Sequence, residues 1–446
     1  MRIALFVHCY YPEHFYGTES YTRTLARELA ALGHEPVVVA ATFPGEPAQD
    51  SLVERYSFDG VPVIRIDRNV HPNTGVRDTY DLPALRFVHE RILRHIQPDM
   101  VHVCHLINHT TALLEVTQRL GLTTVASFTD FFGFCYNNKL NAADGSLCRG
   151  PDRLRANCVA CAFYPAETRG ASSALMRAVV PRVVARAPGL APAEWRPTIA
   201  ALAARPGHLA AAYGAYAGAL VPTRFMRESY ARSGIDVPTE LCRFGIDIDR
   251  AAKPVRDGGP IRLGFIGQLA PHKGLHLLLD ALRQAQAGAF ALDVYGDERM
   301  DPVYAARVRG LASGLDVTFR GTFAIERIAE VLAGLDVLVI PSTWVENSPL
   351  ILLQALATHT PVLVADVEGM SEFVEEGRNG FTFEKGSVPA LAARLARLAA
   401  EPQLAGALAA TTSYERTSRH MVDDVVAFYD RARAGGAGRD HATQTR

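Results

Sequence analysis

Short apolar runs alternate with helical patterns along this chain, and the alternation constrains its fold more than any other feature. Parallel strands need long crossover connections, which are usually helices, so the pattern is typical of parallel sheets. We therefore predict an α/β protein with two Rossmann-like, doubly wound parallel-sheet domains. The expected strands are residues 2–8, 37–39, 99–103 and 124–127 in the first set, and 219–221, 261–267, 292–295, 317–320, 337–340 and 362–365 in the second.

The middle of the 446-residue chain, residues 150–217, is rich in alanine, arginine and proline. We expect helical elaboration there and place the domain boundary near residue 217. Residues 1–217 then form the first domain, with an insertion at about 133–215, and residues 218–415 form the second. A late helix, 416–434, could pack back on the first domain, and the tail 435–446 is expected to be disordered.

The composition is that of an ordinary globular protein, 48% hydrophobic with a formal net charge of -1. Near neutrality argues against a nucleic-acid partner. No apolar run approaches the roughly 20 residues of a membrane-spanning helix, and Met1 leads into a strand rather than a secretory leader. We therefore expect a cytoplasmic protein, whose cysteines are thiols or metal ligands before disulfides.

The most informative local segment follows the strand at 337–340. A polar loop there carries Glu346, and Ser348 and Pro349 are predicted to open a helix as its N-cap and first residue. The start of a helix presents unpaired N–H groups and partial positive charge, which suits a phosphate or diphosphate. A carboxylate beside it can accept hydrogen bonds from sugar hydroxyls. Together these features predict a nucleotide-sugar site.

A second phosphate-binding turn is predicted after the strand at 261–267. Gly267 lets the backbone approach a ligand closely, and Lys273 supplies positive charge on a flexible stem. A plain strand–helix turn with a solvated lysine is the alternative. The Glu346 loop in the same domain favours the ligand site.

Motifs in both predicted domains resemble those of the retaining glycosyltransferases of family 4, which have the GT-B fold. In the second domain the resemblance spans most of residues 219–385 and rests on 264–268, 272–274, 295–297, 321, 341–350, 354–356 and 369–372. In the first it rests on 17–21, 25, 29 and 32–34, and it does not cover the middle. It implies two facing domains with a cleft between the carboxyl ends of their strands, where ligands bind.

The resemblance also implies roles for single residues. Glu346 would contact the transferred sugar and stabilise charge at its anomeric carbon, and Lys273 would neutralise the leaving diphosphate. Gln268 stands where the family often has arginine, and Gln354 where it usually has the glutamate that holds the ribose. Catalysis would need no metal, because a cation and a helix dipole do that work. The implied donor-binding residues are Gly17, Gly267, Gln268, Lys273, Asn347, Ser348, Pro349, Leu350 and Gln354.

Histidines at the end of the strand at 99–103 are candidates for the acceptor side. The family often has His-x-His there, with the second histidine near the sugar, and in this chain that place is Cys104. We choose the adjacent His105 over His102 as the catalytic candidate, with histidines packed inside the sheet as the alternative. Asp130, after the strand at 124–127, is a candidate for binding an acceptor hydroxyl or for capping a helix.

The predicted reaction is retaining transfer of a hexosyl group from a UDP- or GDP-linked sugar to a hydroxyl acceptor. The acceptor would belong to a polysaccharide, a glycolipid or a secondary metabolite, and the departing phosphate oxygen would take its proton. The alternatives are a non-catalytic relative that binds nucleotide-sugar, which Gln268 and Gln354 motivate, and a GT-B epimerase. Motifs do not encode the identity of nucleotide, sugar or acceptor.

Four of the seven cysteines fall within the predicted insertion, at Cys135, Cys148, Cys158 and Cys161. The segment around them is irregular and rich in glycine, asparagine, aspartate and arginine. A structural zinc held by four thiolates would supply order that its few apolar residues cannot. An iron–sulfur cluster and cysteines without a metal are the alternatives. Cys9 and Cys242 are expected in the core.

An arginine-rich stretch follows, with Arg177, Arg182 and Arg186 among apolar residues. A basic amphipathic helix could lie on the inner face of a membrane, where lipid-linked acceptors reside. A solvated helix packed on the first domain is the favoured interpretation, and Pro181 interrupts the helical pattern.

Overall fold

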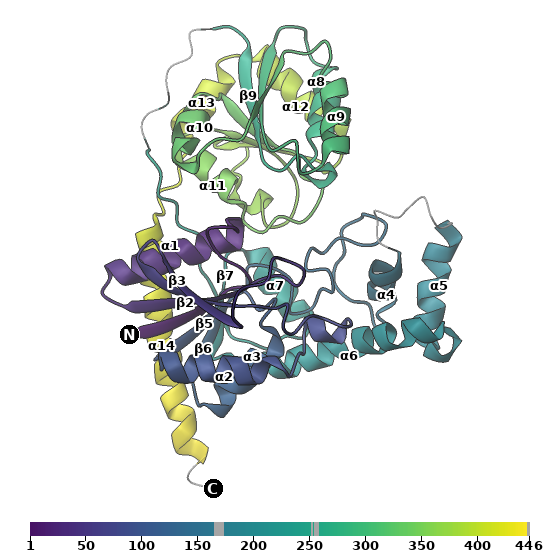
Figure 1. The fold of residues 1–446 in the computed structure, drawn as a ribbon. Helices are drawn as coiled ribbons and strands as arrows, with labels where there is room; N and C mark the ends of the chain where they lie inside the picture. Colours follow the sequence, from purple (N-terminus) through teal and green to yellow (C-terminus); the bar gives the residue numbers. More distant parts are fainter. Residues whose placement is uncertain (165–173, 251–252, 254–257, 444–446) are drawn as a thin grey trace. The chain divides into compact units, whose positions relative to one another are not determined.

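The computed structural model describes residues 1–164, 174–250, 253 and 258–443. The chain forms two compact units, Met1–Phe244 with Ser418–Arg446, and Gly245–Thr417. Figure 1 shows that each unit is built on one sheet with helices on both of its faces. The prediction of an α/β protein with two doubly wound domains is confirmed.

The first unit contains an eight-stranded sheet in the order β3-β4-β2-β1-β5-β6-β7-β8. Its strands pair in parallel, except that β3 and β4 form an antiparallel hairpin. The central strand β1 pairs with β2 on one side and with β5 on the other. The strands are β1 (Arg2–Phe6), β2 (Glu35–Ala41), β3 (Val53–Phe58), β4 (Val61–Ile66), β5 (Met100–Val103), β6 (Thr124–Ser127), β7 (Gly218–Val221) and β8 (Thr239–Leu241).

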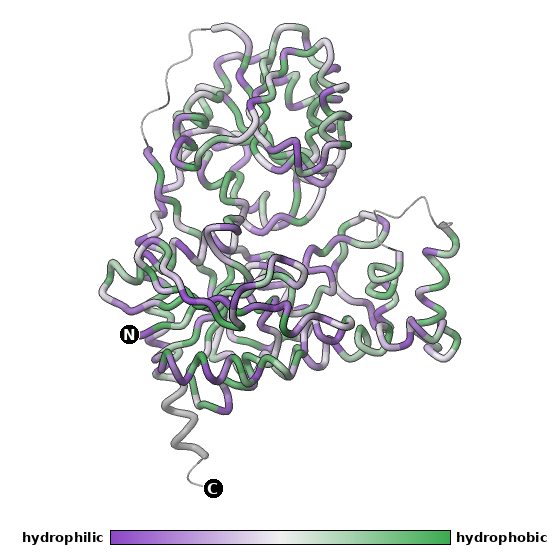
Figure 2. The backbone as a smooth tube through the Cα atoms, in the orientation of Figure 1, coloured by the Kyte–Doolittle hydropathy of each residue, from purple (hydrophilic) through white to green (hydrophobic). Residues whose placement is uncertain are grey.

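Helices cover this sheet because its central strands are apolar on both faces; Ile3, Ala4 and Leu5 of β1 are fully buried. Along α2 the tube alternates between hydrophobic and hydrophilic residues, as expected of a helix with one buried face (Figure 2). Gly33, at φ +81°, follows the end of α1 as predicted. The helices are α1 (Gly17–Ala31), α2 (Leu85–Ile96), α3 (Thr110–Arg119), α7 (Arg224–Arg232) and α14 (Ser418–Thr443).

The predicted insertion is helical, and α4 (Ala156–Phe163), α5 (Ala174–Arg186) and α6 (Arg196–Tyr213) form a lobe at one side of the first sheet (Figure 1). No strand occurs in the described part of residues 150–217, as expected; residues 165–173 lie outside it. Pro181 lies within α5 rather than ending it. Cys158 and Val159 of α4 pack with Val184 and Leu202 in a small apolar core.

The second unit contains a six-stranded, fully parallel sheet in the order β11-β10-β9-β12-β13-β14. Its strands are β9 (Ile261–Ile266), β10 (Phe290–Tyr295), β11 (Val317–Gly321), β12 (Val337–Ile340), β13 (Val362–Ala365) and β14 (Gly380–Phe383). Its helices are α8 (Leu275–Leu282), α9 (Pro302–Leu311), α10 (Ile328–Ala333), α11 (Leu350–Ala357), α12 (Val388–Ala400) and α13 (Leu404–Thr411). Among the described helices of both units, none has the length and apolar content to cross a membrane.

The domain boundary predicted near residue 217 is wrong. β7 pairs with β6, and β8 pairs with β7, so both strands extend the first sheet, and the units divide between Phe244 and Gly245. An apolar run shows that a strand forms but not which sheet it joins.

The C-terminal helix packs back on the first unit, where α14 contacts α1. The expectation of a disordered tail over 435–446 is wrong for its described part, because α14 continues through Thr443. Glycine, which disfavours helix, is the commonest residue of this segment, so its composition does not indicate the helix.

Candidate functional site

In both sheets the strand order reverses beside a central strand. β1 has β2 on one side and β5 on the other, and β9 has β10 on one side and β12 on the other. In open α/β sheets, ligands bind outside the carboxyl ends of strands at such switch points. The predicted site residues follow these strands: His105 comes after β5 in the first unit, and Lys273 and Glu346 come after β9 and β12 in the second.

In the second unit, three loops after neighbouring strands are held against one another. Gly274, at φ +76° in the loop after β9, approaches the loop after β12 so closely that a Cβ atom would collide with the Pro341 carbonyl oxygen. Gly369, at φ +78° in the loop after β13, would likewise collide with the Glu346 carbonyl oxygen. The Ser348 amide donates to the Gly369 carbonyl at 3.0 Å. Only glycine combines this φ with such close approach.

Glu346 is buried where these loops meet, with an exposed fraction of 6%. Its Oε1 accepts hydrogen bonds from Lys273 Nζ at 2.7 Å, Ser342 Oγ at 2.6 Å and Trp344 Nε1 at 2.8 Å. Burial alone would raise the pKa of Glu346, but the Lys273 charge and these hydrogen bonds outweigh burial and lower the pKa below its ordinary value. Glu346 is therefore an anion at neutral pH, and Lys273, predicted to face the diphosphate, is its ion-pair partner.

The start of the next helix differs from the prediction. α11 begins at Leu350, Pro349 is its N-cap residue, and Ser348 precedes it at φ +56°. Ser348 is buried, and its hydroxyl has no hydrogen-bond partner among the described residues, so Ser348 does not cap the helix. A buried hydroxyl without a partner is costly, and a non-glycine residue at positive φ is typical of ligand sites. The arrangement leaves the Ser348 hydroxyl available to a ligand.

The other donor-site candidates lie around the same loops, with one exception. Gly267 follows β9, and its amide donates to the Tyr295 carbonyl at 3.0 Å. Gln268, Asn347 and Gln354 are half-buried, Gln354 within α11. The exception belongs to the first unit, where α1 begins at Gly17.

In the first unit, the two acceptor-side candidates form a pair. His105 Nε2 lies 2.9 Å from Asp130 Oδ2. The Ile107 amide donates to His105 Nδ1 at 3.1 Å, so in the neutral ring the proton is on Nε2. Asp130 Oδ1 accepts from the Phe132 amide at 3.0 Å. Asp130 therefore lies against His105 and also holds the turn after β6.

His102, the candidate not chosen, is a core residue. It is fully buried, with Nδ1 2.6 Å from Tyr429 Oη on α14 and Nε2 2.8 Å from Ser127 Oγ. Burial lowers the pKa of His102 to about 3, so the ring is neutral. The interpretation of a histidine packed within the sheet holds for His102.

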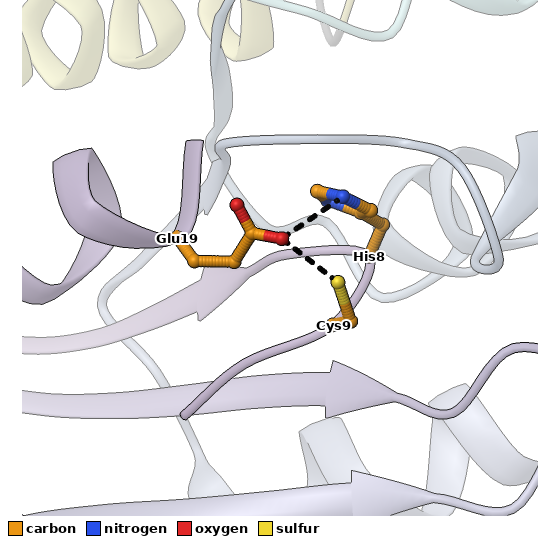
Figure 3. Close-up of side chains that lie close together, drawn as sticks. All are labelled: His8, Cys9 and Glu19. Carbon is orange, nitrogen blue, oxygen red and sulfur yellow. Dashed lines mark hydrogen bonds and ion pairs between the residues drawn. The ribbon is translucent and has the colours of Figure 1, made fainter. Parts of the chain in front are cut away.

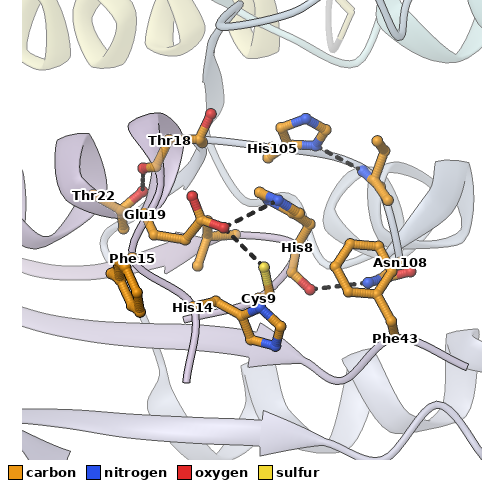
Figure 4. A network of polar contacts seen from close by, with 12 residues as sticks. His8, Cys9, His14, Phe15, Thr18, Glu19, Thr22, Phe43, His105 and Asn108 are labelled. Carbon is orange, nitrogen blue, oxygen red and sulfur yellow. Dashed lines mark hydrogen bonds and ion pairs between the residues drawn. The ribbon is translucent and has the colours of Figure 1, made fainter. Parts of the chain in front are cut away.

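A cluster that the sequence analysis missed adjoins His105. The His8 ring, after β1, lies 4.3 Å from the His105 ring, centroid to centroid. Glu19 Oε1 accepts from Cys9 Sγ at 2.9 Å and lies 3.4 Å from His8 Nε2 (Figure 3). Figure 4 shows Asn108 beside them; its side-chain Nδ2 donates to the His8 carbonyl at 3.0 Å. Burial, and then the neighbouring histidines, lower the pKa of His8 well below its ordinary value.

Cys9 is buried as expected, but it is part of this polar cluster rather than of a purely apolar core. The ligand atoms of His8, Cys9 and Glu19 all lie within 4.8 Å of one another. The sequence does carry a signal for this cluster. His8 directly follows the first apolar run, and Glu19 is an acidic residue in the first turn of the next helix. This pattern predicts that both meet at the end of β1.

The four cysteines of the insertion gather around α4, and none is in a disulfide. Cys158 and Cys161 lie one turn apart on α4. Asn137 connects Cys135 with Cys161, because its Oδ1 accepts from Cys135 Sγ at 3.0 Å and its Nδ2 lies 3.9 Å from Cys161 Sγ.

The fourth thiol is held in a similar way. Cys148 Sγ lies 3.5 Å from Asn157 Nδ2 of α4 and 3.3 Å from the Gly150 carbonyl oxygen. The four sulfurs do not form a closed group of the kind seen at His8, whose ligand atoms lie within 4.8 Å of one another. The structure therefore brings the predicted ligands into one small region with amide groups between them.

Two family models match the chain, "Glycosyltransferase Family 4" over residues 15–158 and "Glycosyl transferases group 1" over residues 260–401. A GDP-mannose-dependent alpha-mannosyltransferase of Mycobacterium tuberculosis is 25% identical over 445 residues, 97% of each chain. A D-inositol 3-phosphate glycosyltransferase of Geodermatophilus obscurus is 32% identical over 212 residues, 42% of this chain and 46% of that one.

Solved structures share the fold. Sucrose-phosphate synthase from Thermosynechococcus elongatus has a TM-score of 0.63 at 18% identity, covering 97% of this chain and 99% of that one. Anabaena HepE, solved in complex with UDP, has a TM-score of 0.63 at 14% identity, covering 97% and 100%.

The matched segments hold most of the site residues described above, while His8 and Cys9 lie before the first segment. The first contains Glu19, His105 and Asp130, and the second contains Lys273 and Glu346. The two doubly wound units and the helix start beside the Glu346–Lys273 ion pair point to the same family as these matches. The chain belongs to the family 4 glycosyltransferases, enzymes of the GT-B fold that transfer a sugar from a nucleotide-sugar donor.

Proposed function

We propose that the protein is a retaining hexosyltransferase that moves a sugar from a UDP- or GDP-linked donor to a hydroxyl acceptor. The observation that carries the proposal is the buried Glu346 anion, bound to Lys273 and placed just before the start of α11. The unpartnered Ser348 hydroxyl between them supports a ligand there. The dependence of one relative on GDP-mannose and the UDP complex of HepE support the two nucleotides.

The chemistry follows from the charges. The diphosphate binds at the first amides of α11, around Leu350, where the helix dipole is positive. Lys273 neutralises charge on the departing diphosphate. The Glu346 carboxylate stabilises the positive charge that develops at the anomeric carbon. The departing phosphate oxygen takes the acceptor proton on the same face of the sugar, so the configuration is retained.

On the acceptor side, His105 with Asp130 and His8 with Glu19 present two carboxylate–histidine pairs in the first unit. We propose that they bind an acceptor hydroxyl and orient it. A pocket of about 500 Å³ in the same unit supports an acceptor rich in hydroxyl groups, because charged and hydrogen-bonding side chains line it together with apolar ones. The lining includes Tyr10, Glu13, His14, Thr42, Gln49 and Arg65.

A donor screen tests the proposal. UDP-, GDP-, ADP- and dTDP-sugars are added singly, and the one that binds the native state is expected to raise the melting temperature. At a hundredfold excess over Kd, binding adds about 2.7 kcal/mol to the free energy of unfolding. The product formed with that donor is expected to keep the anomeric configuration of the donor, as read by NMR.

An inverted product would contradict the retaining mechanism. A donor sugar that changes configuration without an acceptor would identify an epimerase. Donor binding with neither transfer nor slow hydrolysis would identify a non-catalytic relative, the outcome that Gln268 and Gln354 motivate.

We further propose that the acceptor is lipid-linked and that α5 lies on the membrane surface. Leu175, Met176, Val179 and Val183 of α5 are exposed, and they share that face with Arg182. Exposed apolar side chains beside arginine suit an interface with anionic headgroups. This observation favours the membrane over the solvated helix that the sequence suggested.

The membrane proposal predicts that Val179→Ser with Val183→Ser lowers co-sedimentation with phosphatidylglycerol vesicles several-fold, because two apolar side chains no longer enter the lipid. Val303→Ser is the matched control, since Val303 is an even more exposed valine on α9. Equal binding of wild type and the double variant would contradict the proposal. Equal binding to phosphatidylcholine vesicles would contradict a role for the arginines.

A further inference from the structure

Glu19, in the first turn of α1, is a carboxylate buried among uncharged partners. Its exposed fraction is 2%, and its only ion-pair contact in the described part of the chain is with His8, at 3.4 Å. A histidine supplies positive charge only when it is protonated. The other partner of Glu19 is the Cys9 thiol, which is neutral. Buried carboxylates are generally paired with a cation or bound to a metal, so this position favours a cation.

The His8 ring also lacks good hydrogen-bond partners. Its Nδ1 is buried without one among the described residues, and the 3.4 Å from Nε2 to Glu19 Oε1 exceeds the usual hydrogen-bond length of about 2.7–3.2 Å. The ring is nevertheless held in place. It packs against Phe43 and His105, 5.8 and 4.3 Å between ring centroids, and Asn108 binds the His8 carbonyl (Figure 4). An oriented imidazole with such poorly matched nitrogens is suited to binding a metal ion.

The spacing of the three side chains suits zinc, because His8, Cys9 and Glu19 converge at the end of β1 with their ligand atoms within 4.8 Å of one another (Figure 3). With bonds of about 2.0–2.3 Å at tetrahedral angles, the ligand atoms of zinc lie about 3.3–3.6 Å apart. The 3.4 Å between His8 Nε2 and Glu19 Oε1 matches this spacing. The 2.9 Å between Cys9 Sγ and Glu19 Oε1 requires a shift of about half an ångström. Sulfur and imidazole ligands favour Zn²⁺ over Mg²⁺ or Ca²⁺, which prefer oxygen.

We propose that His8, Cys9 and Glu19 bind one Zn²⁺ through Nε2, Sγ and a carboxylate oxygen. The Cys9 thiol releases its proton to solvent as the bond between sulfur and zinc forms. Three protein ligands leave the fourth position open to a water or a substrate oxygen. The His8 side chain is 15% exposed, whereas Cys9 is fully buried, so the ion enters from the side of His8. The acceptor hydroxyl binds at the open position, a role that rests on the proposed function; the metal site itself does not.

Metal analysis of the full-length protein, with neither donor nor acceptor present, tests the site. We expect about one zinc per chain in wild type, and its loss in Cys9→Ser and in Glu19→Gln, which both nearly keep the size of the side chain. Cys242→Ser is the matched control and should keep the metal, because Cys242 is a buried cysteine whose Sγ lies against the Met421 carbonyl. Cys161→Ser should also keep the metal, because Cys161 belongs to the insertion.

Cobalt gives a readout on the unaltered protein, which avoids dependence on variants that fail to fold. Co²⁺ added to zinc-free wild type should produce a thiolate-to-metal charge-transfer band in the near ultraviolet. Cys9→Ser should remove that band and Cys242→Ser should keep it. Wild type that binds neither zinc nor cobalt would overturn the proposal. Metal that persists in Cys9→Ser but disappears in Cys161→Ser would also overturn it, because the ion would then belong to the insertion.

Removal of zinc by a strong chelator separates this proposal from the proposed function. Chelation should raise the KM for the hydroxyl acceptor several-fold. It should leave the melting-temperature shift caused by UDP or GDP unchanged, because the nucleotide is proposed to bind in the second unit. An unchanged acceptor KM would overturn the role of the open position. A protein that binds zinc at these three residues but transfers no sugar would contradict the proposed function and support the metal site.

Discussion

Replacing Glu346 by glutamine is expected to lower kcat for sugar transfer by about 10²–10³-fold while leaving binding of the nucleotide diphosphate largely intact. Glutamine is nearly the same size and can still accept hydrogen bonds from Ser342 and Trp344, whose donors now lie 2.6 and 2.8 Å from Oε1. The negative charge is lost. That charge matters most in the transition state, when the sugar ring becomes cationic, so the loss should fall on kcat rather than on KM.

The ion pair with Lys273 must be separated from the catalytic effect. Glu346→Gln leaves the half-buried Lys273 ammonium without its partner, which by itself lowers stability. Urea unfolding of the variant measures that cost, and the binding of UDP or GDP shows whether the donor site is intact. Glu330→Gln is the control, since it breaks an exposed pair with Arg327 in the same unit and should change neither activity nor binding. An unchanged kcat in Glu346→Gln would remove the central role of this carboxylate.

The strands of both sheets could be predicted because they are buried on both faces and so read as continuous apolar runs. The expected run at 337–340 coincides with β12, and Glu346 lies in the loop after it. The hairpin of β3 and β4 was missed although its signal was present. Asp59 and Gly60 connect the two strands, both at positive φ, as a tight hairpin turn requires.

The details of the candidate site depend on contacts between distant segments, which local patterns do not carry. Ser348 followed by proline is a reasonable N-cap by propensity. Its actual φ of +56° arises because its amide is bound to the Gly369 carbonyl, from the loop after another strand. The ion pair of Lys273 with Glu346 joins residues 73 positions apart. The pairing of His105 with Asp130 likewise depends on β5 and β6 being neighbours in the sheet.

Gly369→Ala is expected to be a strongly disruptive single-methyl change in the second unit. A Cβ atom at Gly369 would collide with the Glu346 carbonyl oxygen, and the backbone there is at φ +78°. Relieving the collision must push apart the loops after β12 and β13. That movement breaks the hydrogen bond from the Ser348 amide and displaces the Glu346 carboxylate. We expect the free energy of unfolding to fall by about 2–5 kcal/mol, combining the clash with the cost of positive φ.

Gly386→Ala separates these two contributions. Gly386 has a similar φ of +74°, but a Cβ atom there meets nothing within 4 Å. It should therefore lose only about 1 kcal/mol and keep full activity. Urea unfolding and donor binding of the two variants measure the difference. If the variants lose equal stability and Gly369→Ala still binds and transfers normally, the contact between the two loops does not hold the catalytic carboxylate. Gly369→Ala can also lose sugar transfer while it remains folded. In that case the contact between the two loops positions Glu346, because the added methyl group meets the backbone of Glu346 and not its carboxylate.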